Sequence, residues 1–206
     1  MKKLLVSVLL ITLIIGVGLR IWYVNAYPDP QFVPPKDEKY QIGEWVPLDG
    51  AFQYSASEDT EGYYVKLEDI VFVTPEEYIE KYGLESDVFA IGPHGEEPEY
   101  VADITLNFRN EDNEEGYILF LYYRIYSEVD LASFVPYDRV NFLLHPEMSD
   151  KLGFRVFPGT ETGPSQFCLI SSVEMNGAIS GSLDNFPKHL QVSTTPERKV
   201  IEIPSN

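Results

Sequence analysis

Histidine and cysteine, which often bind metals or take part in catalysis, are few in this chain, and they are scattered. The three histidines, His94, His145 and His189, share no HxH or HExxH spacing that would place two of them on one face of an element. Ser180 lies in the stretch GAISG, which lacks the G-x-S-x-G spacing of a nucleophile elbow. The sequence therefore predicts no zinc site, no activated serine and no bound cofactor, and we expect the protein not to be an enzyme.

Cys168 is the single cysteine, so the chain can form no internal disulfide. It stands between Phe167 and Leu169 in a predicted strand, and no lysine or histidine lies beside it in the sequence to lower the pKa of its thiol. We therefore expect a small buried apolar side chain and not a nucleophile.

Acidic residues are far more numerous than basic ones, with 33 Asp and Glu against 15 Lys and Arg and a formal net charge of −18. Such a surface repels the phosphates of nucleic acids, which excludes nucleic acid as a partner. Two chemical uses of the acids stay open. A pair of carboxyl groups could hydrolyse a polymer as glycosidases do, and the turn Glu111–Glu115 could bind calcium through its oxygen ligands, although it lacks EF-hand spacing. We expect these acids to be solvated and predict no metal site.

One predicted strand, Tyr117–Tyr126, has the composition of a binding surface. Alternate residues on one face are apolar and suit a core, whereas the other face carries Tyr122, Arg124 and Tyr126. Tyr and Arg are enriched among the residues that dominate binding energies. This Tyr-Arg-Tyr ladder is the predicted binding site, and an ordinary cross-strand aromatic ladder is the alternative.

The elements that must position these residues are mostly strands. Tyr100–Arg109 alternates apolar and polar residues, which is typical of a half-buried strand. The turn Asn110–Gly116 and the return strand that begins at Tyr117 predict a hairpin, with Gly116 in a left-handed conformation. Further strands are predicted at Trp45–Leu48, Gly62–Val73 with a bulge near Glu68 and Asp69, Arg139–Leu144, Gly153–Phe157, Ser165–Val173, His189–Ser193 and Lys199–Ile203.

One helix is predicted over residues 74–83, because Thr74-Pro75-Glu76-Glu77 forms a capping box and Gly83 is a left-handed cap. About 7–9 short strands with this one connecting helix predict an all-β fold, a two-sheet sandwich over residues 40–206. A closed barrel is the alternative architecture.

The N-terminal 26 residues predict where the domain is located. Lys2 and Lys3 precede an apolar run from Leu4 to Leu19, which predicts a hydrophobic helix with its N-terminus in the cytoplasm. This segment is either a membrane anchor that extends to Val24 or a signal peptide cleaved after Ala26. Residues 27–39 are rich in proline and predict a semi-stiff linker. Both alternatives place the domain outside the cytoplasm, either anchored to the cell membrane or secreted.

Four stretches of the predicted domain resemble a known family: YQIGEWVPL at 40–48, ADITLNFRNEDNEEGYI at 102–118, VFPGTETGPSQFCLI at 156–170 and HLQVSTTPERKVIEI at 189–203. Over residues 40–203 the chain is similar to exported immunoglobulin-like proteins of Gram-positive bacteria, a domain of unknown function (family 5028). In plan it is also similar to the immunoglobulin-like accessory domains of bacterial lipoproteins. The resemblance implies an immunoglobulin-like fold and an envelope location, and it brings no activity and no site residues. The chain lacks the lipobox cysteine of the lipoprotein relatives, so a lipid anchor is not implied.

Together these observations predict a non-catalytic binding or accessory domain at the cell envelope, attached to the membrane through its N-terminal segment. It would present a sheet face or a set of loops to another envelope protein or to a cell-wall polymer. The alternatives are a hydrolase of envelope polymers with paired carboxylates and a calcium-stabilised structural domain.

Overall fold

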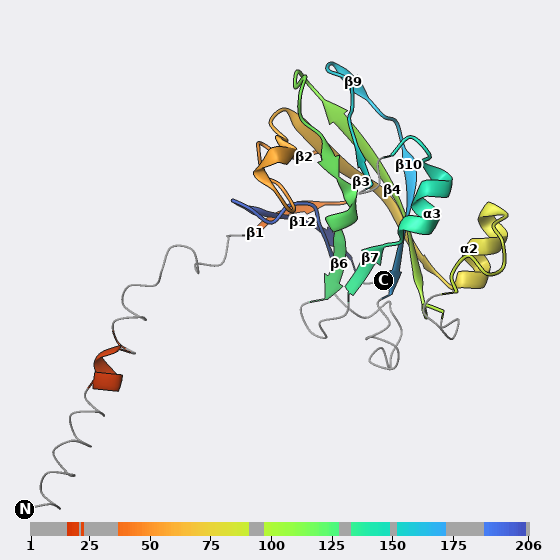
Figure 1. Ribbon diagram of the computed structural model, residues 1–206, viewed down its shortest axis with the longest axis horizontal. Helices are drawn as coiled ribbons and strands as arrows, with labels where there is room; N and C mark the ends of the chain where they lie inside the picture. Colours follow the sequence, from red (N-terminus) through yellow and green to blue (C-terminus); the bar gives the residue numbers. More distant parts are fainter. Residues whose placement is uncertain are drawn as a thin grey trace, which may run out of the picture. The chain divides into compact units, whose positions relative to one another are not determined.

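The computed structural model describes residues 16–20, 22, 37–90, 97–127, 133–148, 152–171 and 188–204 (Figure 1). The chain divides into two compact units, Met1–Pro35 and Lys36–Asn206. In the first unit, residues 16–20 and 22 are helical. Most of the predicted hydrophobic helix and of the proline-rich linker lies outside the described residues. No helix in the described part of the chain has the length and the apolar character needed to cross a membrane.

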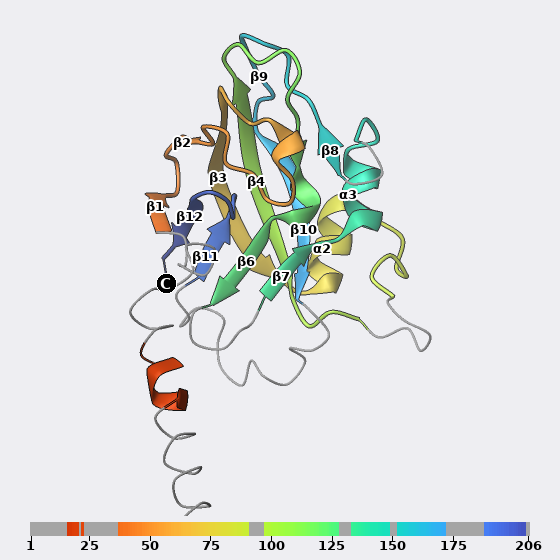
Figure 2. The same cartoon turned by 60° about the vertical axis from the view of Figure 1, so that its left-hand side comes forward.

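The second unit is built mostly from strands, which form a ten-stranded sheet and a two-stranded sheet. The large sheet has the order β1-β12-β11-β6-β7-β10-β4-β3-β2, and β9 pairs in addition with β4 (Figures 1 and 2). Its strands are β1 (Asp37–Gln41), β2 (Val46–Pro47), β3 (Tyr63–Val73), β4 (Val101–Asn110), β6 (Arg124–Ser127), β7 (Ser133–Pro136), β9 (Thr160–Glu161), β10 (Ser165–Ser171), β11 (Lys188–Gln191) and β12 (Arg198–Ile203). The small sheet pairs β5 (Ile118–Leu119) with β8 (Gly153–Phe154).

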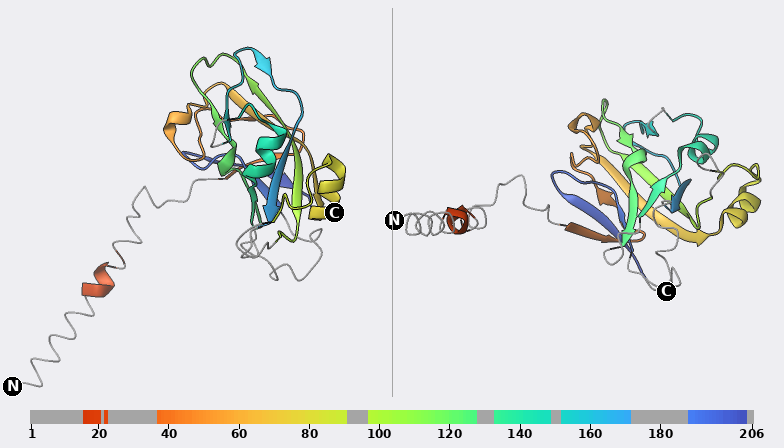
Figure 3. Two further views of the ribbon diagram at one scale, coloured as in Figure 1. Left: turned by 45° about the vertical axis from the view of Figure 1, so that its right-hand side comes forward. Right: turned by 60° about the horizontal axis from the view of Figure 1, so that its bottom comes forward.

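The large sheet curls over on itself, so that its two halves enclose one main core (Figure 3). One buried cluster contains Val65 and Leu106 from β3 and β4 together with Leu190 and Ile201 from β11 and β12. Burial of both inner faces against each other is the arrangement of a sandwich. The predicted mostly-β, sandwich-like fold is therefore confirmed, with strands that are shorter and more numerous than predicted. β1 begins at Asp37, so the last residues assigned to the linker belong to the sheet.

A second, smaller core covers the outer face of β4 and β10. Val101 and Cys168 point outward from these strands and pack against Tyr78 of α2 (Pro75–Tyr82) and Val140 of α3 (Asp138–Leu144). This outer layer explains why β4 is buried on both faces, although its sequence alternates as a half-buried strand should. The predicted helix over 74–83 is confirmed as α2: Glu77 N donates to Thr74 Oγ1, the Glu77 carboxylate accepts from Thr74 N, and Gly83 has a φ of 62°.

Two predictions of secondary structure were wrong. The predicted strand Arg139–Leu144 is α3, because Val140 and Leu144, four residues apart, share the face that packs in the outer core. The predicted strand Tyr117–Tyr126 is broken into β5, the short 3₁₀ helix η3 (Phe120–Tyr122) and β6. Ile118, Leu119 and Phe120 are buried one after another at the point where the chain turns into η3.

The predicted hairpin between β4 and the segment that follows it was also wrong. β4 pairs with β3, β10 and β9, whereas β6 pairs with β11 and β7. Gly116 is required for close approach and not for a left-handed φ, since a Cβ placed there would lie 1.9 Å from the carbonyl oxygen of Asp59. The predicted bulge in β3 is confirmed, as its register to β4 shifts between Leu67 and Asp69.

Candidate binding face

The three residues of the predicted Tyr-Arg-Tyr ladder do not form one surface. Tyr122 lies in η3, where its ring stacks on Tyr54 with centroids 4.6 Å apart and an interplanar angle of 5°. Arg124 and Tyr126 share one face of β6, because they are two residues apart on a strand. Arg124 is exposed, whereas Tyr126 is half-buried, with its ring centroid 5.6 Å from that of His189. The structure therefore keeps Arg124 and Tyr126 together and separates Tyr122 from them.

A compact aromatic and cationic cluster lies instead on the outer face of β2, β3 and β4. It consists of Trp45, Tyr64, Lys66 and Arg109, and we call it the Trp45 face. The register places Tyr64 directly opposite Arg109, while Lys66 follows on the same face of β3. Trp45 directly precedes β2, the strand that borders β3. Val65 of β3 and Phe108 of β4, the immediate neighbours of these residues in the sequence, point into the main core. The four side chains of the Trp45 face therefore point outward, and each is partly exposed.

The side chains of the Trp45 face stack closely. The guanidinium carbon of Arg109 lies 4.2 Å from the ring centroid of Tyr64 and 4.9 Å from that of Trp45. The ammonium of Lys66 lies 4.7 Å from the same indole. One guanidinium therefore contacts two rings and one indole contacts two cations, an arrangement that holds four long side chains in fixed positions.

The cations of the Trp45 face are each balanced by a neighbouring acid. Lys66 forms an ion pair with Glu68 at 2.7 Å, and Arg109 pairs with Glu111 at 3.4 Å. The pKa of Tyr64 is raised, first by burial and second by the charge of Glu111. Arg109 Nε is buried and has no hydrogen-bond partner in the described part of the chain. Because its charges are balanced and its rings are partly exposed, this face is suited to stacking and to hydrogen bonding with a partner.

Arg124 and Tyr126 belong to a second polar face, on β1, β12, β11 and β6. At its centre Arg198 donates two hydrogen bonds to the carboxylate of Asp37, from Nε at 2.6 Å and from Nη2, and its guanidinium lies over the ring of Tyr126. The hydrogen bonds from Arg198 lower the pKa of Asp37. Glu202 also has a lowered pKa, because Gln41 and then Lys39 donate hydrogen bonds to it. A hydrolase needs a carboxyl group with a raised pKa as its general acid, which is the opposite of these two shifts.

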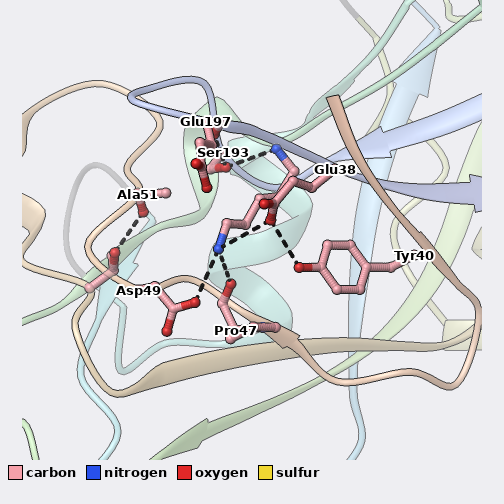
Figure 4. Close-up of polar contacts among 9 residues, drawn as sticks. Glu38, Tyr40, Pro47, Asp49, Ala51, Ser193 and Glu197 are labelled. Carbon is pink, nitrogen blue, oxygen red and sulfur yellow. Dashed lines mark hydrogen bonds and ion pairs between the residues drawn. The ribbon is translucent and has the colours of Figure 1, made fainter. Parts of the chain in front are cut away.

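Lys199 of β12 is a buried cation whose partners come from β1 and from the end of β2, the two ends of the sheet. Figure 4 labels three of these partners, Glu38, Pro47 and Asp49. The side chain of Lys199 is only 3% exposed, and its Nζ donates to the carbonyl oxygen of Pro47 at 2.6 Å. The same ammonium lies 3.3 Å from Asp49 Oδ2 and 3.7 Å from Glu38 Oε2, and Glu38 also accepts a hydrogen bond from the hydroxyl of Tyr40. Burial, the hydrogen bond to Glu38 and the charge of Glu38 raise the pKa of Tyr40 to about 12. This set ties β1 and β12 to the end of β2, which is a structural role.

The acidic turn is held by side-chain hydrogen bonds of Asn113. Asn113 Nδ2 donates to the carbonyl oxygens of Asp59 and Glu61, and Asn113 Oδ1 accepts from the backbone of Glu115 and Gly116. Carboxylates from both segments line an open depression here, formed by Asp59, Glu61, Asp112, Asn113, Glu114 and Glu115. Across the described ranges, no group of three or more His, Cys, Asp or Glu side chains is arranged to hold a metal ion.

Cys168 is fully buried in the outer core, as predicted. Burial raises the pKa of its thiol. The side chain of Asn141 forms two hydrogen bonds with the backbone of Cys168, accepting from Cys168 N and donating to Cys168 O. Of the three histidines, His145 follows α3 and His189 lies in β11, whereas His94 and also Ser180 lie outside the described residues.

The Trp45 face cannot be predicted from any single segment of the sequence. Its residues come from β3, from β4 and from the position just before β2, and only the register of β3 on β4 brings Tyr64 next to Arg109. The available signal was local: Tyr64 and Lys66 alternate with the apolar Val65 and Leu67, which indicates an outward face for the first pair.

Comparison with known proteins gives one family and one solved structure. The family model described as "Domain of unknown function (DUF5028)" matches residues 37–199. No curated protein matches the chain. A solved structure described as an uncharacterized beta-sandwich protein from Clostridium difficile 630 is similar over 85% of this chain and 99% of its own, with 12% identity and a TM-score of 0.41.

Proposed function

We propose that this chain, which belongs to the family described as Domain of unknown function (DUF5028), is a non-catalytic binding module presented at the cell envelope. Its second unit would have an immunoglobulin-like arrangement and would bind a partner protein through the Trp45 face. The N-terminal segment would hold the module at the outer side of the membrane, or would direct its secretion.

The observation that supports a binding role is the stacking of Trp45, Tyr64 and Arg109. Trp, Tyr and Arg are the residue types most enriched among those that dominate interface energies. Such side chains contribute most when they are already held in place, because ordering a free side chain on binding costs about 0.5–1.5 kcal/mol. The two cation–π contacts of Arg109 supply this order in the free protein.

The sequence of the N-terminal segment supports the proposed location. Two lysines before a long apolar run are typical of an export signal or an anchor. Protease treatment of intact cells tests this directly. If the segment is an anchor, an external protease should remove the second unit from intact cells; if it is cleaved, the second unit should be present in the medium. A unit that is degraded only after the membrane is broken would contradict the location.

The binding role is tested by photo-crosslinking of the full chain in its native cells, followed by mass spectrometry. Trp45→Ala should reduce capture of the main partner by at least about tenfold, since a central interface residue contributes about 2 kcal/mol or more. Phe157→Ala is the matched control, because Phe157 is also a large apolar side chain and is 81% exposed.

The outcomes are distinct. Equal capture by wild type and the Trp45→Ala variant, with both folded by circular dichroism, would show that the Trp45 face is not the interface. Capture of no protein at all, together with retention of the chain on isolated cell wall, would replace the protein partner with a wall polymer.

A further inference from the structure

The second half of β3 has a strand neighbour on one side only. β3 pairs with β4 along its whole length, but β2 pairs with it only at Tyr64 and Val65. From Asp69 to Val73, a segment that we call the β3 edge, no described strand lies on the side away from β4. An uncovered edge presents unpaired backbone amides and carbonyls, to which another strand can add.

The direction of the backbone groups at the start of β3 follows from the contacts made there. The carbonyl oxygen of Tyr63 accepts from Leu48 N and that of Leu67 accepts from Gly43 N, both at 2.8 Å. Before the bulge, the backbone amides and carbonyls of the odd-numbered residues of β3 therefore point away from β4. The bulge after Leu67 inserts one residue into β3. Beyond it, the backbone amides and carbonyls of the even-numbered residues therefore point away from β4.

The contacts of β4 give the same answer independently. The carbonyl oxygen of Tyr100 accepts from Ser171 N, so even-numbered residues of β4 face β10 and odd-numbered ones face β3. Asp103 and Val101 are opposite Val71 and Val73. Val71 and Val73 thus bond to β4, and the amides and carbonyls of Ile70 and Phe72 point to the β3 edge.

A groove of about 300 Å³ lies against this edge. Its walls are mostly apolar side chains, together with the acid Asp69 and the base Lys188: they are Ile42, Asp69, Ile70, Val71, Phe72, Lys188, Ile203 and Pro204. Val71 is 45% exposed on this edge. Natural edges are commonly protected by charged residues, proline, a bulge or a short strand. Here the bulge and Asp69 lie at the start of the edge, and residues 70–73 contain no charged residue and no proline.

The charge at the groove favours a basic partner. Asp69 is exposed at the groove, whereas Lys188 is buried with its ammonium 4.4 Å from the ring centroid of Phe72, so a partner in the groove meets the carboxylate of Asp69 more directly than the ammonium. The chain as a whole has a formal net charge of −18, which attracts cationic partners over long range.

We propose that the β3 edge binds an extended segment of a partner protein as an added strand, with apolar side chains alternating with basic ones. Backbone hydrogen bonds to Ile70 and Phe72 would fix the segment, its apolar side chains would enter the groove, and its basic side chains would face Asp69. This inference goes beyond the proposed function and does not depend on the Trp45 face.

The test uses the full chain in detergent micelles and three acetylated and amidated peptides of sequence KVKVKVK, EVEVEVE and KVPVPVK. The first should bind saturably and the second at least about tenfold more weakly, because its charge is reversed. KVPVPVK keeps two of the four lysines and lacks two of the backbone amides that an added strand needs, and it should also bind at least about tenfold more weakly.

Amide hydrogen exchange by NMR distinguishes strand addition from general attraction to an acidic protein. In the free chain the amides of Ile70 and Phe72 should exchange rapidly and those of Val71 and Val73 slowly. Saturation with KVKVKVK should slow Ile70 and Phe72 by at least about tenfold and leave the two valines unchanged. Asp69→Lys should weaken KVKVKVK binding, whereas Glu114→Lys, the same charge change on the acidic turn, should not.

Several results would overturn the proposal. One is that KVKVKVK shows no saturable binding, and another is that it binds without slowing the amides of Ile70 and Phe72. Protection of these two amides in the dilute free chain would show that the β3 edge is already covered. Protection that rises with protein concentration in the absence of peptide would identify a second copy as the occupant.

Discussion

Replacing Lys199 is the sharpest test of how the curled sheet is held together. Lys199→Met keeps the length and the apolar stem of the side chain but removes the ammonium that links Pro47, Asp49 and Glu38. Lys199→Ala removes the stem as well. Comparison of the two variants separates the polar contribution from the packing contribution.

The expected magnitudes follow from the exposure of each partner. Loss of the 2.6 Å hydrogen bond leaves the Pro47 carbonyl oxygen without this donor, at a cost of about 1–3 kcal/mol. Glu38 and Asp49 have side chains that are 38% and 60% exposed, so water can replace the ammonium and their loss adds at most about 1 kcal/mol. We expect about 1–3 kcal/mol for Lys199→Met. Loss of three buried methylenes should add roughly 2 kcal/mol in Lys199→Ala.

Urea unfolding of the purified chain, followed by tryptophan fluorescence, measures these differences as changes in midpoint at constant m-value. Lys39→Met is the matched control, because Lys39 also pairs with an acid but its side chain is 48% exposed; it should cost less than about 1 kcal/mol. The reasoning is refuted if Lys199→Met is as stable as wild type, or if Lys39→Met is equally destabilising.

Three further predictions concern single positions. Gly116→Ala should destabilise by more than about 3 kcal/mol in the same urea assay, because its Cβ would meet the Asp59 carbonyl oxygen. Gly163→Ala is the control: no atom lies near its Cβ and only its φ of +75° is unfavourable, so it should cost about 1–2 kcal/mol. Equal costs for the two variants would contradict this reasoning. Cys168 should react with an aromatic disulfide reagent about a thousandfold more slowly in the folded chain than in urea, since burial raises the pKa of its thiol; a fast native reaction would show that the outer core opens readily. The pKa of Asp37 is lowered in the folded state, so its pairing with Arg198 stabilises the fold above the unfolded pKa of about 3.9. This stabilisation is lost as the pH falls through the lower folded pKa. The difference in the free energy of unfolding between wild type and Asp37→Asn should therefore disappear between pH 4 and pH 2, and a constant difference would argue against the ion pair.

The features that the sequence predicted well are those whose causes lie within a few residues. The capping box of α2 needs only Thr74 and Glu77, and Gly83 ends the same helix. The bulge in β3 is visible as a change in the alternation of apolar residues, and it is found between Leu67 and Asp69. The burial of Cys168 follows from its apolar neighbours in a strand.

The features that were missed depend on partners far away in the sequence. Asn141 favours α3 because it bonds to Cys168, and nothing near Asn141 indicates this contact. The segment around η3 turns in order to fill the core between the two halves of the sheet, which overrides its period-two pattern. Lys199 and Asp49 are 150 residues apart, so their pairing exists only once the sheet has curled.

The same dependence on long-range register explains the outcome for the predicted binding residues. Arg124 and Tyr126 were correctly placed on one face of a strand, but Tyr122 was assigned to that face on the assumption of an unbroken strand. The Trp45 face combines residues of β3 and β4 with one residue that precedes β2, and only strand pairing brings them together.

The parallel pairing of β1 with β12 has a mechanical consequence. β1 is the first strand of the unit and β12 is the last, and Asp37 at the start of β1 lies opposite Arg198 at the start of β12. Tension between the two ends of the unit pulls these parallel strands in opposite directions along their length. All of their backbone hydrogen bonds, with the pairs Asp37–Arg198 and Lys39–Glu202, are then loaded in shear at the same time instead of being unzipped one by one. The pair therefore resists stretching of the unit from its two ends.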